Sequence, residues 1–321
     1  MNNKIFEFGI DVIDLQIKAL KKLRNSLEHP FQHAVKAITK CKSKVIICGV
    51  GKSGKIASKI SATLSSVGCP SFSVSANDCS HGDLGRITKQ DLLILISLSG
   101  NTEELKNIIK YAKSNKINLI GIVSNKNSYL YKHSDIKLLL PEVKESGFGF
   151  VPTSSTTIQL CLGDALAIAA MRHKKFKKLD FKKFHPGGSL GNKLMTASDV
   201  MLTGDKIPFV NESQNMKHAL KILNQKKLGF IVVIDNKGLN VGVFTDGDLK
   251  RLIQKKKFIE NYKIKLFMSK KPISVEKNTL ATDILDKMNK RKITNICVYE
   301  RKNIRKTIGV IHIHNLINIT K

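Results

Sequence analysis

The chain has 321 residues, a length that favours about two or three domains over a single core. Its hydrophobic content of 42% and its charged content of 25% are ordinary for globular proteins. The net charge of +30 suggests nucleic-acid binding, but the lysines are spread through every segment, and 0 Trp and 5 Tyr leave few rings to stack on bases. We therefore expect anionic ligands in general and no specific nucleic acid.

The sequence predicts neither membrane insertion nor export. No apolar run approaches the about 20 residues of a membrane span, and the most apolar stretch, CLGDALAIAAM, is interrupted by Asp164. Glu7, Asp11 and Asp14 fall where a signal peptide would be uncharged. The 6 cysteines form no C-x-x-C pair, which argues against a disulfide framework and a zinc cage. We expect a cytoplasmic protein without a membrane partner.

The first two thirds of the chain predict helices followed by an α/β domain. Residues 5–27 repeat apolar residues at the spacing of one helix face, and a second helix is predicted over 31–41. Apolar runs then alternate with helical stretches near 53–66, 102–115 and 155–173; the runs cover 44–48, 71–75, 92–97, 118–124 and 136–140. Continuous apolar runs are typical of strands buried on both faces, so we predict a doubly wound, five-stranded parallel sheet.

From about residue 198 the chain repeats itself. VMLTGDKIPFV and FMSKKPISV each begin one copy, and the same order of helical and apolar segments follows both of them. Four positions align between the copies: Met201 with Met268, Asn224 with Asn289, Gly242 with Gly309, and Leu249 with Leu316. We predict two packed β-α-β-β-α units at 199–257 and 264–321.

The stretch GVGKSG, residues 49–54, lies where a parallel sheet binds ligands, at the carboxyl end of a strand. A nucleotide P-loop would need a glycine at Ile46, so that interpretation fails. The glycines do match the dinucleotide pattern G-x-G-x-x-G. The dinucleotide fold also expects an acid at the end of the next strand, where this chain has Ser75, with Asp78 only in the loop beyond.

Two hydroxyl clusters favour a third ligand, a single phosphate. Ser97, Ser99 and Thr102 surround a glycine between a strand and a helix, and helix N-termini supply unpaired N–H donors. Ordinary N-capping is the alternative, but it needs only one hydroxyl. A second cluster, residues 152–156, opens the helix over 155–173. Two such clusters facing one crevice favour a phosphomonoester such as a sugar phosphate.

Six stretches in fixed order carry a family resemblance: GVGKSGKIASKI, HGDLG, ISLSGNTEEL, VPTSSTT, GDALAIA and HPGGSLG. With the repeat that follows, they resemble a sugar isomerase (SIS) domain and paired CBS domains, the arrangement of the arabinose 5-phosphate isomerases. The resemblance implies N-terminal helices over 1–42, a SIS domain over 43–192 and CBS domains in the two repeats. It implies interconversion of D-arabinose 5-phosphate and D-ribulose 5-phosphate, the first step toward Kdo, by a homo-oligomer, expected to be a tetramer, without a required cofactor.

The same resemblance implies four catalytic residues, Lys52, Glu104, Glu145 and His185. The predicted substrate contacts are Ser53, Gly68, Cys69, His81, Ser97, Ser99, Thr102, Ser154 and Ser155. Many relatives carry His where this chain has Ser75, and a zinc has been placed there. We therefore expect no metal.

Isomerisation needs an opened sugar ring, a proton taken from C2, a stabilised enediol and a proton returned to C1. A carboxylate shielded from water can have its pKa raised toward neutrality and shuttle that proton. We assign this base to Glu145 or Glu104, and ring opening and the hydroxyl protons to the other glutamate and His185. Lys52 would stabilise oxyanion charge or the phosphate.

The first repeat ends Gly242-x-x-Thr245-x-x-Asp248, a hydroxyl and a carboxylate that could hold the ribose and phosphate of an adenine or cytidine nucleotide. The second repeat has His312 and Asn315 there, so its site is altered. The alternative is that the pair only packs and assembles subunits. Two rival functions also stay open: a non-catalytic sugar-phosphate sensor, although no helix-turn-helix is visible, and an isomerase of another phosphosugar.

Overall fold

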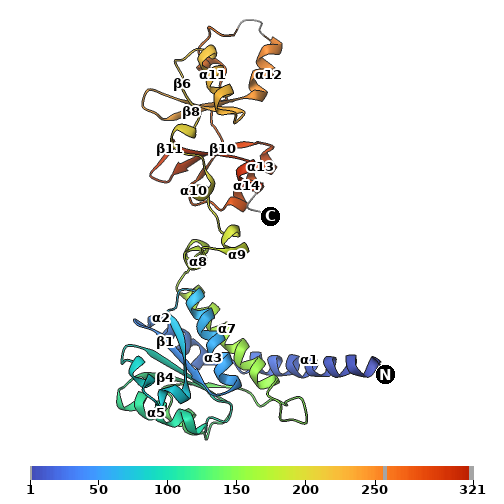
Figure 1. Cartoon of the computed structure of the whole chain (residues 1–321), viewed down its shortest axis with the longest axis vertical. Helices are drawn as coiled ribbons and strands as arrows, with labels where there is room; N and C mark the ends of the chain where they lie inside the picture. The colour runs from blue at the N-terminus through green and yellow to red at the C-terminus, as the bar shows by residue number, and fades with distance from the viewer. Residues whose placement is uncertain (1, 256–258, 318–321) are drawn as a thin grey trace. The chain divides into compact units, whose positions relative to one another are not determined.

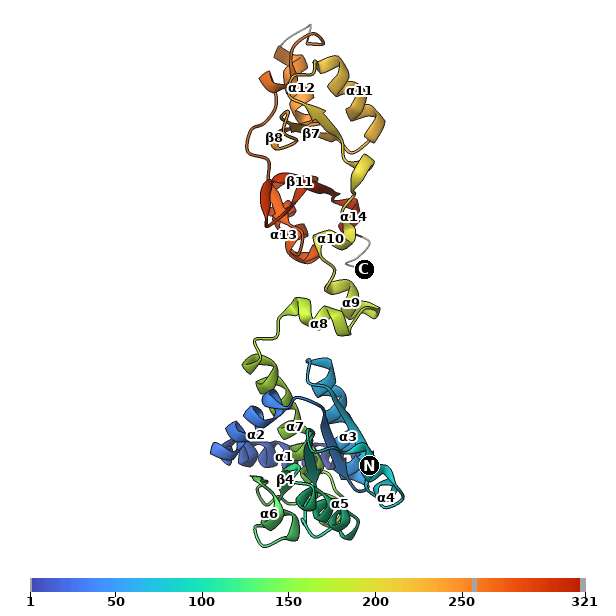
Figure 2. The ribbon, with the colours of Figure 1, turned by 90° about the vertical axis from the view of Figure 1, so that its left-hand side faces the viewer.

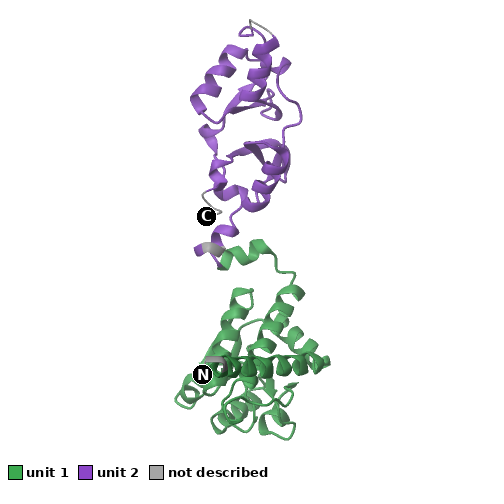
Figure 3. Cartoon of the chain, turned by 90° about the vertical axis from the view of Figure 1, so that its right-hand side faces the viewer, with its two compact units in different colours: residues 1–184 green, residues 185–321 purple. Residues whose placement is uncertain are grey.

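The computed structural model describes residues 2–255 and 259–317. They fall into two compact units, residues 1–184 and 185–321, which are described separately (Figure 3). The predicted ends of the two repeats, residues 257 and 321, lie outside the described residues.

Unit 1 contains the predicted five-stranded sheet. Its order is β2-β1-β3-β4-β5, and every pair of neighbours is parallel. The strands are β1 (Val45–Gly49), β2 (Ser71–Ser75), β3 (Leu92–Ile96), β4 (Asn118–Val123) and β5 (Ile136–Leu139). The buried strands β1 and β3 have no exposed face, which is why their sequences are continuous apolar runs.

Helices cover both faces of this sheet, so the predicted doubly wound class is confirmed. Alternate strand residues point into two different cores. One core takes α1 (Asn2–Asn25), α2 (His29–Lys40), α3 (Lys52–Ser66) and α7 (Ser154–His173). The other takes α4 (Ala76–Cys79), α5 (Glu103–Ser114), α6 (Tyr129–His133) and the residues around the 3-10 turn η1 (Asp83–Arg86). Figure 1 and Figure 2 show the sheet between these layers.

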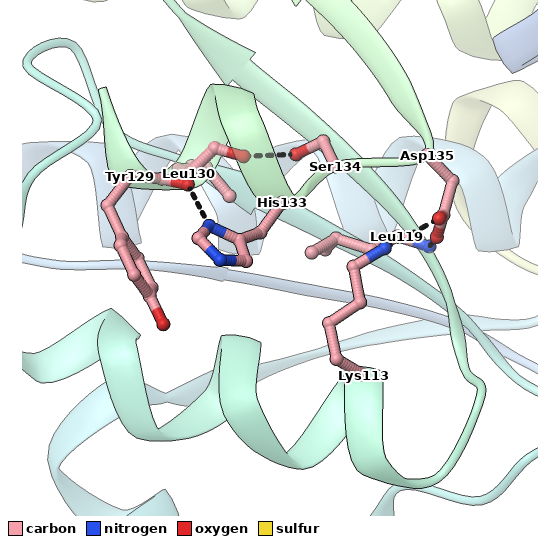
Figure 4. Close-up of polar contacts among 7 residues, drawn as sticks. All are labelled: Lys113, Leu119, Tyr129, Leu130, His133, Ser134 and Asp135. Atoms are coloured by element: carbon pink, nitrogen blue, oxygen red, sulfur yellow. Dashed lines mark hydrogen bonds and ion pairs between the residues drawn. The ribbon is translucent and has the colours of Figure 1, made fainter. Parts of the chain in front are cut away.

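Asp135 anchors the edge strand β5 (Figure 4). One carboxylate oxygen accepts a hydrogen bond from the Leu119 backbone N–H at 2.8 Å, and the other pairs with the Lys113 ammonium at 2.6 Å. Just before it, the Ser134 hydroxyl donates to the Leu130 carbonyl at 2.6 Å and ends α6. These contacts join the end of α5, the start of β4 and the start of β5.

Among the described residues, α7 alone has the length and apolar composition of a membrane span. It packs against α1, α2 and α3, and its Ile158, Leu162 and Leu166 lie in the core of unit 1. These contacts account for its apolar composition as that of a core helix.

Unit 2 contains the two predicted repeats after two short helices, α9 (Gly188–Lys193) and α10 (Ala197–Val200). The first repeat comprises β6 (Phe209–Asn211), α11 (Met216–Lys226), β7 (Phe230–Ile234), β8 (Asn240–Thr245) and α12 (Asp246–Lys255). The second comprises β9 (Ser274–Glu276), α13 (Ala281–Arg291), β10 (Asn295–Glu300), β11 (Asn303–His312) and α14 (His314–Ile317). Each forms its own three-stranded sheet, which confirms the β-α-β-β-α order.

The aligned methionines and glycines of the repeats contact each other crosswise. Met201 packs on Gly309, and Met268 packs on Gly242, where an added Cβ would lie 2.7 Å from the methionine sulfur. Backbone hydrogen bonds support both crossings, from Leu202 to Val310 and from Ser269 to Val243, each at 2.8 Å. The repeats therefore share one pseudo-symmetric interface, and only glycine leaves room for the opposing methionine.

Candidate active site

The GVGKSG loop is a tight strand-to-helix turn. A Cβ at Gly49 would lie 2.8 Å from the Ser53 backbone, and Gly51 has a φ of +58°. The Ser53 hydroxyl donates to Gln159 Oε1 of α7 at 3.2 Å. The turn places Lys52, exposed, at the first position of α3.

The loops that follow β1 and β3 lie beside each other at this turn and lead to opposite faces of the sheet. Gly49 at the end of β1 pairs with Ile96 at the end of β3, yet the following helices cover opposite faces of the sheet. The crevice where neighbouring strands diverge in this way is the usual ligand site of open α/β sheets. Lys52 follows one strand and the Ser97–Thr102 loop follows the other.

In the Ser97–Thr102 loop, two hydroxyls bond to each other and not to the helix. Ser97 Oγ and Thr102 Oγ1 lie 2.7 Å apart, and Ser97 Oγ accepts the Gly100 N–H at 3.0 Å. Thr102 precedes α5 but makes no side-chain cap to it. The first N–H groups of α5 therefore have no hydroxyl cap, as an anion site requires. Glu104 lies exposed on this first turn, and Ser99 is exposed on the loop.

Glu145 occupies the N-terminus of α7. Its carboxylate accepts backbone N–H groups from Thr153 at 2.9 Å and Ser155 at 3.2 Å, and the Thr153 hydroxyl at 3.1 Å. Burial alone would raise the pKa of Glu145, but the hydrogen bonds from Ser155 and Thr153 outweigh it and lower the pKa below its ordinary value. A raised pKa, expected for a proton shuttle, is therefore wrong for Glu145 in this conformation.

Ser154 and Ser155, the two predicted substrate contacts on α7, are buried. Ser154 is 0% exposed and Ser155 is 2% exposed. The Ser154 hydroxyl has no hydrogen-bond partner among the described residues. Neither side chain reaches the surface of unit 1 in this arrangement.

Contacts along α3 and α7 show which candidate residues lie at the edge of the sheet that is formed by the carboxyl ends of its strands. The two helices run in parallel, because Ser53 bonds to Gln159 near their starts and Lys174, just past the end of α7, bonds to the Gly68 carbonyl at 2.5 Å. The N-terminus of α7 therefore lies at the same edge as Lys52. Gly68 and the buried Cys69 lie at the opposite edge, where β2 begins beside the start of β1. The structure does not bring these two predicted substrate contacts together with the others.

His81 lies exposed in the turn after α4, and its backbone N–H donates to the Asp78 carbonyl at 2.9 Å. This segment follows the carboxyl end of β2, so His81 lies at the same edge as Lys52. Ser75 Oγ accepts the Asp78 N–H at 3.4 Å. Within the described residues there is no group of three or more His, Cys, Asp or Glu side chains suited to a metal.

His185 belongs to unit 2, so its place beside the unit 1 residues stays a prediction. It is half-buried before α9, and a Cβ at Gly191 would lie 2.9 Å from the His185 carbonyl oxygen. Gly191 therefore permits the chain to turn back closely onto the backbone of His185 and Pro186.

One supporting residue was missed by the sequence analysis: Gln159, 1% exposed, which joins α7 to Ser53. Thr153 belongs to the predicted hydroxyl cluster 152–156, but its N–H and hydroxyl are donated to Glu145. A signal existed for Gln159, since an amide within an apolar helix is a buried polar exception that needs a partner.

Unit 2 contains a cavity of about 750 Å³ between its repeats. Asp248 accepts the Thr245 hydroxyl at 2.8 Å and pairs with Arg251 at 2.6 Å. In the second repeat Asn315 accepts the His312 N–H at 3.0 Å, the equivalent of the bond from the Thr245 N–H to Asp248. Burial and the neighbouring His314 lower the pKa of His312. The basic side chains that line the cavity are Lys227, Arg251, Lys271 and Lys292.

The SIS domain model matches residues 37–169, and the CBS domain model matches 197–255 and 263–320. The chain is 39% identical to the arabinose 5-phosphate isomerase KdsD of Francisella tularensis over 316 residues, 97% of this chain and 96% of that one. It is 39% identical to KdsD of Yersinia pestis, covering 96% of this chain and 94% of that one. The solved structure of Escherichia coli CFT073 c3406 in complex with arabinose 5-phosphate matches 58% of this chain and 100% of its own, with 35% identity and a TM-score of 0.56. The chain belongs to the arabinose 5-phosphate isomerase family.

Proposed function

We propose that this protein is an aldose–ketose isomerase that interconverts D-arabinose 5-phosphate and D-ribulose 5-phosphate through an enediol. Its product would feed Kdo synthesis, and with it lipopolysaccharide or capsule. The observation that carries the proposal is near-full-length similarity to arabinose 5-phosphate isomerases. The related structure solved with arabinose 5-phosphate supports it. The rival functions are a non-catalytic sugar-phosphate sensor and an isomerase of another phosphosugar.

The substrate phosphate would bind at the N-terminus of α5. Thr102 leaves the first N–H groups of α5 uncapped, and the Ser99 hydroxyl is exposed beside them. A helix N-terminus binds anions through these donors and its dipole. Lys52 follows β1, the strand next to β3. Its ammonium would add positive charge for the phosphate or for the oxygen that becomes negative in the enediol.

The contacts favour Glu104 as the enediol base. Glu145 is already hydrogen-bonded to the α7 N-terminus, which weakens it as a base, whereas Glu104 is exposed at the edge of the sheet. The Glu104 carboxylate would take the proton from C2 of the aldose and return it to C1, so that no net proton is consumed. His185 would move the hydroxyl protons and assist ring opening.

Incubation with ribulose 5-phosphate, followed by NMR, tests the reaction, and the expected product is arabinose 5-phosphate. In deuterated water, an enediol intermediate should introduce deuterium at the carbon that receives the proton. No turnover of ribulose 5-phosphate, together with binding of the same compound, would favour the sensor. Turnover of a hexose phosphate alone would favour an isomerase of another phosphosugar.

Lys52→Met should lower kcat/KM by about 100-fold or more, because an ammonium at developing charge is worth about 3 to 4 kcal/mol. Lys55→Met is the matched control, since Lys55 is exposed one turn later on the same helix. Equal activities of the two variants would remove Lys52 from the site.

A nucleotide is a second candidate ligand, at the cavity of unit 2. Thr245 and Asp248 lie at its wall with four basic side chains, as a phosphorylated ribose would need. Calorimetry with AMP, ATP and CMP-linked sugars tests this proposal. No heat with any of them would favour a pair that only assembles subunits.

We also propose that the enzyme works in the cytoplasm as a homo-oligomer, with a tetramer as the expected form. The family resemblance supports the oligomer, and sedimentation of the full chain measures it. The domain limits 1–42, 43–192, 199–257 and 264–321 stay predictions.

A further inference from the structure

The loop that joins Glu145 to α7 carries two phenylalanines at the surface. Phe148 is 99% exposed and Phe150 is 86% exposed. Figure 1 shows the loop that leads into α7 projecting from the sheet. Single apolar residues are common on protein surfaces, but two large aromatic side chains on one short loop form a patch. Such a patch indicates a surface that another group covers in some state of the protein.

The backbone of the loop turns tightly at its tip. Gly147, Phe148 and Gly149 have φ values of +57°, +62° and +82°. Glycine adopts this left-handed region freely, whereas a bulky side chain seldom does. Below the tip, the Val151 N–H donates to the Ser146 carbonyl at 3.2 Å and closes the stem. The tip therefore holds an aromatic residue in an unfavourable backbone conformation, although glycine occupies the positions on both sides of it.

The stem of the loop contains buried hydroxyls without partners. Ser146 is 9% exposed and Ser154 is 0% exposed, and neither hydroxyl oxygen has a hydrogen-bond partner among the described residues. Buried polar groups normally have partners, so each exception needs an explanation. Ser146 follows Glu145, and Ser154 lies between the two residues whose N–H groups bind that carboxylate, Thr153 and Ser155. An exposed patch, a strained tip and unpartnered hydroxyls in one segment are typical of a loop with a second arrangement.

We propose that residues 146–151 form a lid that closes over the bound sugar phosphate and places Phe148 and Phe150 against its carbon chain. The loop leads directly into the N-terminus of α7, which lies at the same edge of the sheet as Lys52. The Glu145 carboxylate fixes the start of the loop on α7, so the lid swings as a unit about this anchor. The inference rests on the proposed function, since the occupant is its substrate.

Aromatic side chains suit this task chemically. An open-chain pentose phosphate presents C–H groups that pack against a ring, and an uncharged ring does not compete with the phosphate for the cationic groups of the site. Closure over the reacting carbons excludes water and strengthens the interaction of Lys52 and Glu104 with the enediol. The lid itself transfers no proton, so the reaction balances as proposed above.

Fluorescence of the full chain tests the closure. The sequence has 0 Trp, so Phe148→Trp introduces a single indole at the tip. Ribulose 5-phosphate should shift its emission to shorter wavelength and reduce its quenching by acrylamide. Phe8→Trp is the control and should not respond, because Phe8 is 63% exposed on α1. No response of Phe148→Trp to bound ribulose 5-phosphate would overturn the lid. So would an indole that is already protected in the free protein, which would indicate that a second copy covers the loop.

Kinetics provide an independent measurement. Phe148→Gly and Phe150→Ala should each lower kcat/KM by about 10-fold, the effect of losing part of a buried aromatic contact. Phe148→Gly should not lower the midpoint of thermal unfolding, because glycine adopts the tip conformation without strain, whereas a structural ring would be missed. Phe8→Ala should retain wild-type kinetics. Unchanged kinetics in both loop variants of an active enzyme would overturn the lid and leave the isomerase function standing. A wild type that neither binds nor converts ribulose 5-phosphate would overturn both.

Discussion

Helices α5 and α7 both start after hydroxyl-rich loops, but their N-termini are used differently. At α7 the Glu145 carboxylate accepts backbone N–H groups from Thr153 and Ser155. At α5 the loop hydroxyls Ser97 and Thr102 bond to each other and leave the helix uncapped. One terminus already holds an internal anion, whereas the other is open to an external one.

From this difference we infer distinct roles for the two candidate glutamates. Two anions repel each other at one helix N-terminus, so a substrate phosphate is disfavoured where Glu145 sits. We therefore expect Glu145 to position α7 and Glu104, on the open terminus, to act as the base. Three predictions test this division, from the largest effect to the smallest.

Glu104→Gln should lower kcat/KM by about 100- to 10,000-fold, the range of a lost general base. Its midpoint of thermal unfolding should stay near that of the wild type, because Glu104 is exposed. Glu103→Gln is the matched control, since Glu103 is exposed on the same turn and pairs with Lys106 at the surface. Near-normal activity of Glu104→Gln would contradict the division and return the base to Glu145.

Ser97→Ala should lower kcat/KM by about 10-fold, mainly by raising KM, because the Ser97 hydroxyl orders the loop through Gly100 and Thr102 and a hydrogen bond of this kind is worth about 1.5 kcal/mol. The comparison variant at the other terminus is Thr156→Val, whose hydroxyl bonds to the Thr153 carbonyl at 2.9 Å. It should leave KM unchanged. Equal KM changes in both variants would contradict the proposal that the substrate phosphate binds at the N-terminus of α5 and not at that of α7.

Glu145→Gln should destabilise unit 1 by about 1 kcal/mol at pH 7, the usual effect of a lost charge at a helix N-terminus. The pKa of Glu145 is lowered on folding, so its stabilisation is fully present above the ordinary carboxyl pKa, about 4.3. It is lost as the pH falls through the lower folded value. The difference between wild type and variant should therefore be constant from about pH 5 to 8 and shrink in more acidic solution.

Urea unfolding at several pH values measures this difference. Glu142→Gln is the control, because Glu142 is exposed on the same segment and its backbone carbonyl accepts a hydrogen bond from Lys22. A stability difference at pH 7 that persists unchanged below about pH 4 would show that the carboxylate charge is not what seats α7.

Most elements of the fold were predictable because burial leaves a pattern in the sequence. A strand covered on both faces must be apolar at every position, and β1 and β3 are. The repeat alignment matched Met201 with Met268 and Gly242 with Gly309, but it did not predict that the methionine of each copy packs on the glycine of the other. The short helices α4 and α6 were not predicted, since four or five residues are too few to show a helical period.

The site was predictable in part. Loops at the carboxyl ends of strands were expected to meet, because parallel strands bring those ends to one edge, and Lys52 and Glu104 follow that rule. Gly68 and Cys69 do not, because α3 carries the chain back to the opposite edge before β2 starts. The residue types at these two positions contain no information about which edge they reach.

The sequence by itself determined the layers of unit 1, the pairing of the repeats and the edge of the sheet at which Lys52 and Glu104 lie, because these follow from where apolar residues must be buried. Only the tertiary structure decided how the polar groups are used. Glu145 and Glu104 are the same residue type beside similar loops, and what separates them is whether folding brings N–H donors to the carboxylate. Hydrogen bonds depend on distances of a few tenths of an ångström, which sequence spacing does not specify.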